Sequence, residues 1–315
     1  MRRAITLVLV AAACRGGSKA PSDGATAGGE LVVAMQPDAS ATLPVDFRFA
    51  VVGDTRPPNM DDVNGYPTGV ITAIWGDVQA VHPDFAISTG DYMFATSSTP
   101  PTSSTVDKQL DLYLGARAQY TNAVFAAMGN HECTGATASN CGPGSADGVT
   151  FNMAEYQKRM LAPLGITLPY FTIPFAASDG SWTAKLVFVA ANAWNPTQSA
   201  WLDGALAQPT TYTFVIRHES DDTTETPGVA PSETLIAKYP FTLKIVGHTH
   251  TYEHDAANHE IIVGNGGAPL TSGTNYGYVI VERLDSAVIQ VTAYDYQTNA
   301  VHQQFRINAD GTAAP

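Results

Sequence analysis

Short apolar runs that end in polar clusters recur along the chain. The clearest run, Phe241–Val246, is rich in β-prone residues and is followed by Gly247, His248 and His250. This composition predicts a buried strand. Residues two apart in an extended chain point the same way, so both imidazoles can reach one small site. Imidazole is a common metal ligand, although two exposed loop histidines would give the same pattern.

The first half of the chain alternates between strand and helix patterns, and the last quarter is nearly all strand. Strands are predicted over Asp46–Val52, Phe85–Ser88, Ala123–Met128, Tyr170–Phe175, Lys185–Ala191 and Thr211–Ile216. Helices are predicted over Val70–Val81, Val106–Thr121, Met153–Leu161, Pro196–Ala207 and Ser232–Lys238, the last with Ser232 as N-cap. Mainly antiparallel strands follow over Glu260–Val263, Tyr276–Leu284, Ala287–Tyr296 and His302–Ile307. This order predicts sheet layers flanked by helices.

The composition limits the kinds of molecule that the protein is expected to bind. The 315 residues are 44% hydrophobic and 14% charged, which suits a folded domain with a substantial core. The net charge is -13, and no basic stripe of the kind that nucleic-acid surfaces need is present. We therefore expect no nucleic-acid partner, whereas a small anion held by metal ions remains compatible with this charge.

The first residues resemble an export signal. Arg2 and Arg3 precede the apolar run Ala4–Ala13, which is too short to span a bilayer, and Cys14 follows small residues as in a lipobox. We expect residues 1–14 to be a signal peptide with a lipobox, 15–44 a flexible tether and 45–315 the folded domain. The protein would then be exported, periplasmic or at the cell surface, and attached to a bacterial membrane only through Cys14. An ordinary signal peptide cleaved nearby is the alternative.

Two further cysteines, Cys133 and Cys141, lie in a stretch rich in Gly, Ser, Thr and Asn. An even pair in an exported chain predicts a disulfide, with two free thiols as the alternative.

Five predicted strands end in residues that can bind metals. In chain order they are Asp54, Asp91, Asn130 with His131, His218, and His248 with His250. In open α/β sheets, ligands bind beyond the carboxyl ends of the strands. A mixed oxygen and nitrogen set suits Zn, Mn or Fe better than Ca. The number of candidates exceeds the four ligands of a structural zinc site, which favours two metal ions.

The series GD…GD…GNHE…H…GHTH resembles the calcineurin-like metallophosphoesterase superfamily, which includes the purple acid phosphatases, here in the form of a bacterial lipoprotein. The resemblance covers about Asp46–Ile307. It implies an α/β fold, a four-layer α/β/β/α sandwich of two mixed β-sheets flanked by helices. It also implies that Asp54 and His250 bind one metal, that Asp91 bridges both, that Asn130, His218 and His248 bind the second, and that His131 is the general acid.

The chain departs from the family pattern at two positions. Arg56 replaces the usual His or Gly and cannot be a ligand, because guanidinium has no free lone pair. It would contact a substrate phosphate or form a salt bridge with a nearby carboxylate, and the first metal would be weakly held or missing. Phe94 stands where purple acid phosphatases have a ligand Tyr, and Tyr92 is expected to point elsewhere.

Other polar and aromatic residues leave their roles open. Glu132 could orient His131 or bind solvent, with a surface charge slightly favoured, and Tyr252 could line the pocket or pack. The histidines without a motif, at positions 82, 254, 259 and 302, are expected to be structural or exposed.

The resemblance implies a metal-dependent phosphoesterase that hydrolyses a phosphate mono- or diester by metal-activated hydroxide. Its cofactors would be two divalent or mixed-valence ions (Zn, Mn or Fe), or only one, and its substrate a small phosphorylated molecule bound by a monomer. The loop Ala95–Thr105 and the insertion Cys133–Val149 would carry specificity. The alternative is a non-catalytic, surface-anchored module that binds metal or phosphate through a degraded first metal site. Because such a module needs no general acid, the Asn130-His131 pair argues against it.

Overall fold

The computed structural model describes residues 41–96, 102–134, 150–271 and 273–315. The expected signal peptide, lipobox and most of the tether lie outside these ranges, as do Cys141 and most of the insertion. None of the helices in these ranges is long and apolar enough to cross a lipid bilayer.

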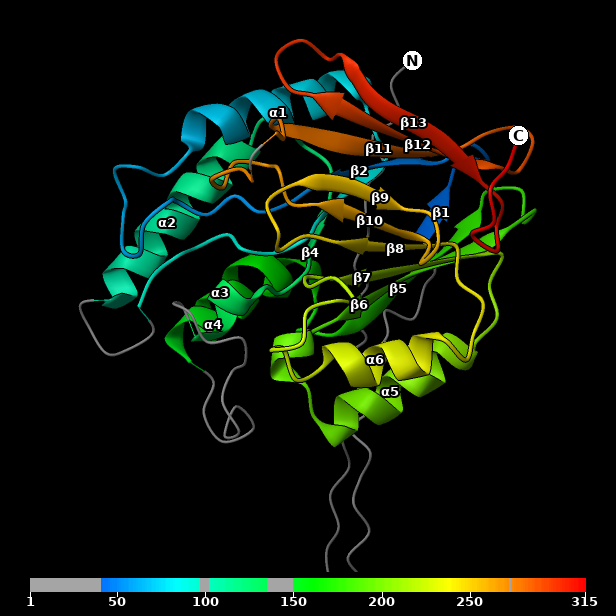
Figure 1. Ribbon diagram of the computed structural model, residues 1–315, viewed down its shortest axis with the longest axis horizontal. Helices are drawn as coiled ribbons and strands as arrows, with labels where there is room; N and C mark the ends of the chain where they lie inside the picture. The colour runs from blue at the N-terminus through cyan, green and yellow to red at the C-terminus, as the bar shows by residue number, and fades with distance from the viewer. Residues whose placement is uncertain (1–40, 97–101, 135–149, 272) are drawn as a thin grey trace, which may run out of the picture. The chain divides into compact units, whose positions relative to one another are not determined.

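Two mixed β-sheets form the centre of the described part (Figure 1). The first has the order β1-β5-β6-β7-β8-β10-β9 and the second the order β13-β12-β11-β2-β3-β4. The strands of the first sheet are β1 (Ala41–Leu43), β5 (Phe171–Ala177), β6 (Thr183–Val189), β7 (Tyr212–Arg217), β8 (Leu243–Val246), β9 (Tyr252–Asp255) and β10 (Glu260–Val263). Those of the second are β2 (Arg48–Val52), β3 (Phe85–Ser88), β4 (Val124–Ala126), β11 (Gly277–Arg283), β12 (Ile289–Asp295) and β13 (Val301–Ile307).

Parallel pairing within each sheet brings the ends of the key strands to one edge. Strands β2, β3 and β4 are parallel in one sheet, and β6, β7, β8 and β10 are parallel in the other. They are buried almost throughout, which explains their continuous apolar runs. Consequently the loops after β2, β3, β4, β7 and β8 can meet at a common edge.

Helices cover the outer faces of both sheets and complete four layers, which confirms the predicted α/β/β/α fold (Figure 1). Helices α1 (Thr68–Val81) and α2 (Thr102–Arg117) lie on the outer side of the β2 sheet. Helices α5 (Pro196–Ala207) and α6 (Val229–Ile236) pack on the other sheet, where Leu202, Leu206 and Ile236 contact Val187, Val189 and Val215. The short helices are α3 (Asn130–Thr134), α4 (Phe151–Tyr156), the π-helix η1 (Gln157–Leu161) and the 3₁₀ turns η2 (Ala162–Leu164) and η3 (Ala191–Ala193).

Aromatic residues join the two sheets. Phe49 of β2 contacts Phe214 of β7 edge to face, with ring centroids 5.1 Å apart, and Phe85 of β3 stacks on Phe175 of β5 at 4.8 Å. Such pairs stabilise by about 0.5–1.5 kcal/mol beyond the area they bury. They fix the two sheets face to face and so fix the edge at which the loops meet.

Some predicted boundaries are wrong. Ala41–Leu43, placed in the tether, pairs in parallel with β5 as strand β1. Helix α2 already begins at Thr102, inside the predicted Ala95–Thr105 loop. Ser232 is not an N-cap but lies within α6, where its hydroxyl accepts a hydrogen bond from Arg217 and donates one to the Val229 carbonyl. Strand β9 was not predicted, because its sequence YEHD is largely polar.

Candidate metal centre

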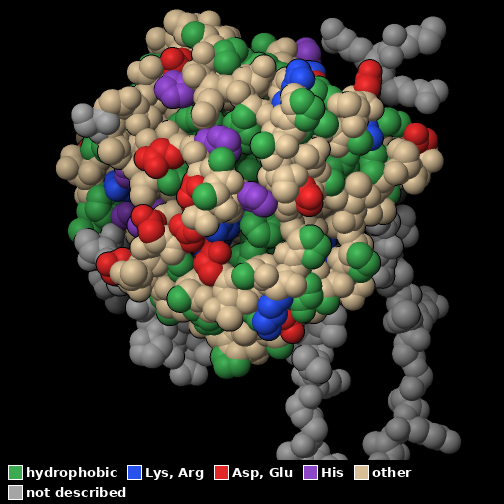
Figure 2. Space-filling view, turned by 45° about the vertical axis from the view of Figure 1, so that its right-hand side comes forward, with side chains coloured by type: hydrophobic (Ala, Val, Ile, Leu, Met, Phe, Trp, Pro, Cys, Tyr) green, Lys and Arg blue, Asp and Glu red, His purple; other side chains and the backbone are tan. Residues whose placement is uncertain are grey.

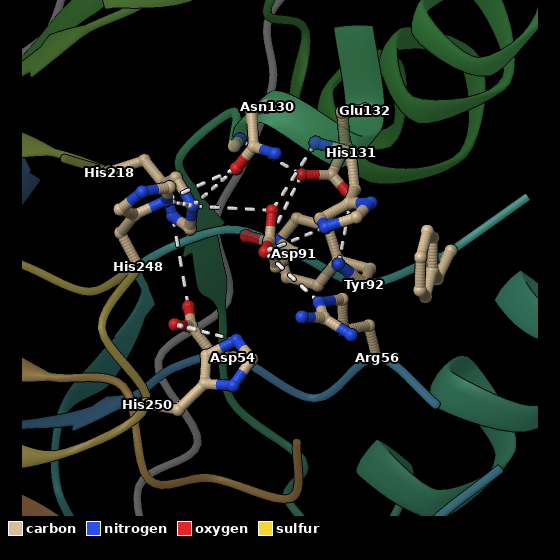
Figure 3. Close-up of polar contacts among 12 residues, drawn as sticks. Asp54, Arg56, Asp91, Tyr92, Asn130, His131, Glu132, His218, His248 and His250 are labelled. Atoms are coloured by element: carbon tan, nitrogen blue, oxygen red, sulfur yellow. Dashed lines mark hydrogen bonds and ion pairs between the residues drawn. The ribbon is translucent and has the colours of Figure 1, made fainter. Parts of the chain in front are cut away.

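All six predicted metal ligands meet at the carboxyl ends of strands from both sheets (Figure 3). Asp54 follows β2 and Asp91 follows β3, while Asn130 begins helix α3 after β4. His218 follows β7, and His248 and His250 follow β8 of the other sheet. The six side chains therefore come from five loops that are distant in sequence.

The backbone is in the left-handed region at four of these residues. The φ angles are 57° at Asp54, 56° at Asp91, 72° at His248 and 49° at His250. Positive φ is uncommon for residues other than glycine and costs of order 1–3 kcal/mol where it is strained. Such residues concentrate at functional sites, and here the sharp turn at each strand end directs the side chain into the site.

Four donor atoms form a tight cluster around His218. Its Nε2 lies 3.2 Å from Asp91 Oδ1, 3.2 Å from Asn130 Oδ1 and 3.3 Å from His248 Nδ1. His248 Nδ1 is also 3.2 Å from Asn130 Oδ1. Ligand atoms in a tetrahedron around one zinc ion lie roughly 3.4 Å apart. The mutual distances among the atoms of His218, Asn130 and His248 therefore fit three ligands of a single ion, with Asp91 Oδ1 beside His218.

Backbone carbonyls fix the orientation of two of the rings. His218 Nδ1 lies 2.9 Å from the Thr89 carbonyl oxygen, and His250 Nδ1 lies 2.8 Å from that of Pro269. A carbonyl only accepts, so Nδ1 carries the proton in both rings. When the ring is neutral, the lone pair on Nε2 points into the site, as in the usual arrangement of metal-binding histidines.

The carboxylate of Asp54 lacks the hydrogen bonds that a buried charge usually has. It is fully buried, and neither of its carboxylate oxygens has a hydrogen-bond partner among the described residues. The imidazole nitrogens beside it are His218 Nδ1 at 3.7 Å and His250 Nε2 at 3.8 Å. A buried carboxylate without donors is costly unless it binds a cation. Asp54, Asp91 and His250 could hold a metal ion, since one ligand atom of each lies within 4.8 Å of the others.

Two glycines allow the chain to pass close to this carboxylate. A Cβ atom on Gly247 would lie 2.8 Å from Asp54 Oδ1, and one on Gly264 would lie 2.8 Å from Asp54 Oδ2. Any larger residue would displace the carboxylate, which explains the glycines after β8 and β10.

Burial and neighbouring charges shift the pKa values of Asp54, Asp91 and His218 in different directions. Burial raises the pKa of Asp54 well above its ordinary value. Burial alone would also raise the pKa of Asp91, but His218, His131 and Arg56 outweigh it and hold that pKa well below its usual range. Burial likewise opposes protonation of His218, yet Asp91 and Asp54 raise its pKa well above normal.

The other two histidines are neutral at physiological pH. Burial, with His218 nearby, lowers the pKa of His248 to about 4. Burial, with Arg56 nearby, lowers the pKa of His250 to about 4. Neutral imidazole is the form that binds metals.

Arg56 and His131 lie on the opposite side of Asp91 from His218 (Figure 3). Arg56 Nε is 3.6 Å and His131 Nε2 is 3.7 Å from Asp91 Oδ2. The guanidinium carbon lies 4.8 Å from the centre of the Phe94 ring, whose edge contact with the His131 ring has a centroid distance of 4.5 Å. The salt bridge to a carboxylate is thus present, and it is made to the predicted bridging ligand.

The expectation that Glu132 is a surface charge is wrong. It is fully buried and accepts hydrogen bonds from the backbone N–H groups of Asp91, Tyr92 and Gly129, at 2.7–2.8 Å. Burial, followed by the charge of Asp91, raises its pKa to about 7. It therefore joins the loop after β3 to helix α3. Only its place beside His131 in the sequence pointed to this residue.

The aromatic residues near the motifs lie outside the cluster. The Tyr92 hydroxyl donates to backbone carbonyls in the core, at 2.9 Å for Ala127, so Tyr92 is not a ligand. The Tyr252 hydroxyl donates to Gln303 Oε1 at 2.9 Å.

Comparison with known families identifies the fold. The family model described as calcineurin-like phosphoesterase matches residues 47–252, well over half of the chain. The chain belongs to the calcineurin-like phosphoesterase family. No curated protein sequence matches it significantly.

Solved structures of this family's fold are similar over most of the chain. A purple acid phosphatase from yellow lupin (Lupinus luteus) seeds is 15% identical with a TM-score of 0.58, over 89% of this chain and 58% of that one. A dimetal phosphatase from Danio rerio is 12% identical with a TM-score of 0.57, over 84% and 99%. The anchor in the inner membrane complex of Plasmodium is 13% identical with a TM-score of 0.53, over 84% and 89%. At these identities the likeness shows the fold, and the chain spans little more than half of the lupin enzyme.

Proposed function

We propose that this calcineurin-like phosphoesterase hydrolyses a small phosphate mono- or diester with the help of bound metal ions. The observation that carries the proposal is the buried Asp54 carboxylate, which has no hydrogen-bond partner and faces His250, His218 and Asp91. The family membership supports phosphoester hydrolysis. The fold alone does not establish catalysis, because a similar structure is described as an anchor.

The metal ligands fall into two sets that share Asp91. Asn130, His218 and His248 would complete one set, and Asp54 with His250 would complete the other. Bound ions of the Zn, Mn or Fe type would lower the pKa of a water molecule and stabilise negative charge on the phosphoryl oxygens. The donor set contains oxygen and neutral nitrogen atoms, which suits these metals.

Two cationic side chains would act directly on the substrate. Arg56 offers a planar guanidinium that can bind two phosphoryl oxygens, and its contacts with Phe94 and Asp91 hold it beside the metal centre. His131 would hold a proton on Nε2, stabilised by Asp91 Oδ2, and donate it to the oxygen of the departing alcohol. Glu132 would hold Asp91 and His131 in fixed relative positions, since its carboxylate accepts hydrogen bonds from the backbone N–H groups of Asp91 and Gly129.

Turnover and metal content together test this proposal. The purified full chain should hydrolyse p-nitrophenyl phosphate or bis-p-nitrophenyl phosphate when Mn, Zn or Fe is supplied, and Asp54→Asn should lose one of the two ions together with turnover. Asp285→Asn removes an exposed charge in the β11–β12 turn and should change neither. Metal binding without turnover of any phosphoester would instead support the non-catalytic binding module.

We also propose that the protein is exported and anchored through a lipid on Cys14. The support is the sequence MRRAITLVLVAAAC at the start of the chain. In a bacterial host, Cys14→Ser should move the protein from the membrane fraction to the soluble fraction. Unchanged membrane association would contradict the anchor.

A further inference from the structure

A cavity lies at the start of strand β4, away from the candidate metal centre. Its volume is about 210 Å³, and a water molecule in the liquid occupies about 30 Å³, so the cavity can hold an organic molecule of several non-hydrogen atoms. Its walls are the end of helix α2, the residues around the start of β4, and the segment from the end of η1 through η2. Because β4 runs from this cavity toward Asn130, the two sites lie at opposite ends of that strand.

Arg117, the last residue of α2, lines this cavity and has no partner for its charge among the described residues. Its side chain is half-buried: Nε is enclosed without a hydrogen-bond partner, whereas the two Nη atoms stay accessible to solvent. The helix dipole favours an arginine at the C-terminus of a helix, but it does not account for an enclosed donor without a partner. Enclosure of such a group is unfavourable, and an anion beside the accessible Nη atoms would offset this cost.

The second arginine of the lining, Arg159, is already paired. Its Nη1 donates to the Asp107 carbonyl oxygen at 3.0 Å, and its guanidinium forms ion pairs with the carboxylates of Asp107 and Asp111. These contacts join η1 to α2 and balance the charge of Arg159. Within the described lining, Arg117 therefore carries the charge that remains unbalanced.

The rest of the protein does not attract an anion. The chain has 29 Asp and Glu residues against 16 Lys and Arg. On the face shown in Figure 2, basic side chains are scattered singly among acidic ones. Binding of an anion at Arg117 therefore depends on short-range contacts within the cavity, which salt screens less than contacts on an open surface.

The polar side chains just before β4 are engaged with other segments. The Thr121 hydroxyl donates to Gln79 Oε1 at 3.2 Å, and Asn122 Nδ2 donates to the Pro83 carbonyl oxygen at 2.9 Å. These bonds hold the loop between α2 and β4 against the end of α1 and the turn that follows it. They leave the Nη atoms of Arg117 as the main donors to a ligand.

The remaining walls of the cavity are apolar. Val124 of β4 and Met160 of η1 are buried, and Leu164 of η2 packs against the main hydrophobic core. All three line the cavity, together with Pro163. An apolar group enclosed among such residues is removed from water, which favours binding. The cavity therefore suits a ligand with one anionic group and a short apolar tail.

We propose that this cavity binds a small organic carboxylate, independently of any hydrolysis at the metal centre. The two carboxylate oxygens would accept hydrogen bonds from the two Nη atoms of Arg117, because they match the planar fork of the guanidinium. The apolar tail would lie against Met160 and Leu164. A carboxylate fits better than a phosphate, since the additional oxygen of a phosphate group would find no free donor on Arg117.

Calorimetric titration of the metal-free full chain with sodium hexanoate tests the site. Hexanoate should bind saturably, whereas hexanol and inorganic phosphate should not. From acetate through butanoate to hexanoate, the affinity should rise about fourfold for each added CH₂ group, as the tail leaves water. Absence of saturable hexanoate binding, or acetate binding that is equally tight, would overturn the proposal. Phosphate binding that is as tight as that of hexanoate and is lost in Arg117→Gln would overturn the choice of a carboxylate.

Substitutions place the ligand within the molecule. Arg117→Gln should weaken hexanoate binding by more than about tenfold, the size expected for loss of a charged hydrogen bond. Leu164→Trp fills the cavity and retains the arginine, and it should weaken binding as well, so the test does not depend on the folding of one variant. Arg306→Gln, the same change at an exposed position of β13, and Arg56→Gln at the metal centre should leave binding unchanged. Equal binding by wild type and Arg117→Gln, or loss of binding in Arg56→Gln, would overturn the site.

Discussion

The two proposed halves of the candidate metal centre would share Asp91, and they differ in what surrounds this residue. Around His218, its Nε2 lies 3.2–3.3 Å from donor atoms of Asp91, Asn130 and His248, of which Asn130 and His248 are neutral. Around Asp54, the ligand atoms are farther apart, with His250 Nε2 at 3.8 Å. The Arg56 guanidinium lies close by, 3.6 Å from Asp91 Oδ2.

We relate this difference to Arg56, which stands where the family pattern has His or Gly. An arginine supplies a permanent positive charge where a further ligand would otherwise bind, and it repels a cation held by Asp54 and His250. The half around His218 is separated from Arg56 by Asp91 (Figure 3). We therefore expect unequal metal affinities, with the ion at His218 held more tightly.

The largest effect should follow Asp91→Asn, which damages both halves at once. Even outer partners of metal ligands cost about 10–100-fold in affinity or activity, so turnover should fall by more than about 100-fold. Metal analysis should show loss of both ions, measured against Asp285→Asn. Full metal content in Asp91→Asn would show that this carboxylate does not join the two halves.

Replacement of His131 by Gln should reduce turnover and spare metal binding. General acids contribute about 10²–10⁴-fold when the leaving group is poor. The loss should therefore be large for an alkyl phosphate and small for p-nitrophenyl phosphate, whose phenol leaves without a proton. An equal loss for both substrates would contradict the role of general acid.

Arg56→His tests whether the arginine weakens metal binding by Asp54 and His250. The change removes a charge and offers an imidazole, so the half around Asp54 should bind its ion more tightly. KM for a phosphate monoester should rise about tenfold, because a charged hydrogen bond to the substrate is lost. Arg56→Gln is the matched control, since it should raise KM without improving metal binding. Equal metal content in the two variants would exclude repulsion by Arg56 as the cause of the difference.

A smaller effect is expected on the stability of the metal-free protein. The pKa values of His248 and His250 are about 4 in the folded state, against about 6.5 in the unfolded chain. At these two sites the unfolded chain thus binds more protons between these values, so the two histidines lower the free energy of unfolding as pH falls through this range. Asp54, His218 and Glu132 act in the opposite direction, because their raised pKa values favour proton uptake by the folded state.

Thermal unfolding measured between about pH 7 and pH 5 tests whether each group changes the stability in the expected direction. His250→Gln should lose less stability than wild type on acidification, and Asp54→Asn should lose more. The reverse order would contradict the charge assignments.

Sheet layers flanked by helices could be predicted from local patterns, because each apolar run marks a strand and Asp54, Asp91 and His218 stand beyond such runs. The four-layer sandwich and the set of six candidate ligands were predicted from the resemblance of the motif series to a known family. Parallel pairing explains why strand ends meet within one sheet, but no local pattern says how the second sheet is placed. The catalytic and metal-binding roles of these residues stay predictions for the experiments above.

Other features depend on contacts between segments far apart in the chain. Glu132 is buried because the N–H groups of Asp91 and Tyr92, about forty residues away in sequence, need an acceptor. The cavity beside Arg117 arises only when the end of α2 meets the start of β4 and the segment from η1 to η2. No pattern within any of these segments indicates such partners.

Calorimetric titration of the metal-free full chain with Zn²⁺ tests the central claim most directly. We predict two binding steps of unequal affinity, of which His218→Ala removes the tighter and Asp54→Asn the weaker. Absence of binding, or loss of the same step in both variants, would contradict a metal centre with two unequal halves.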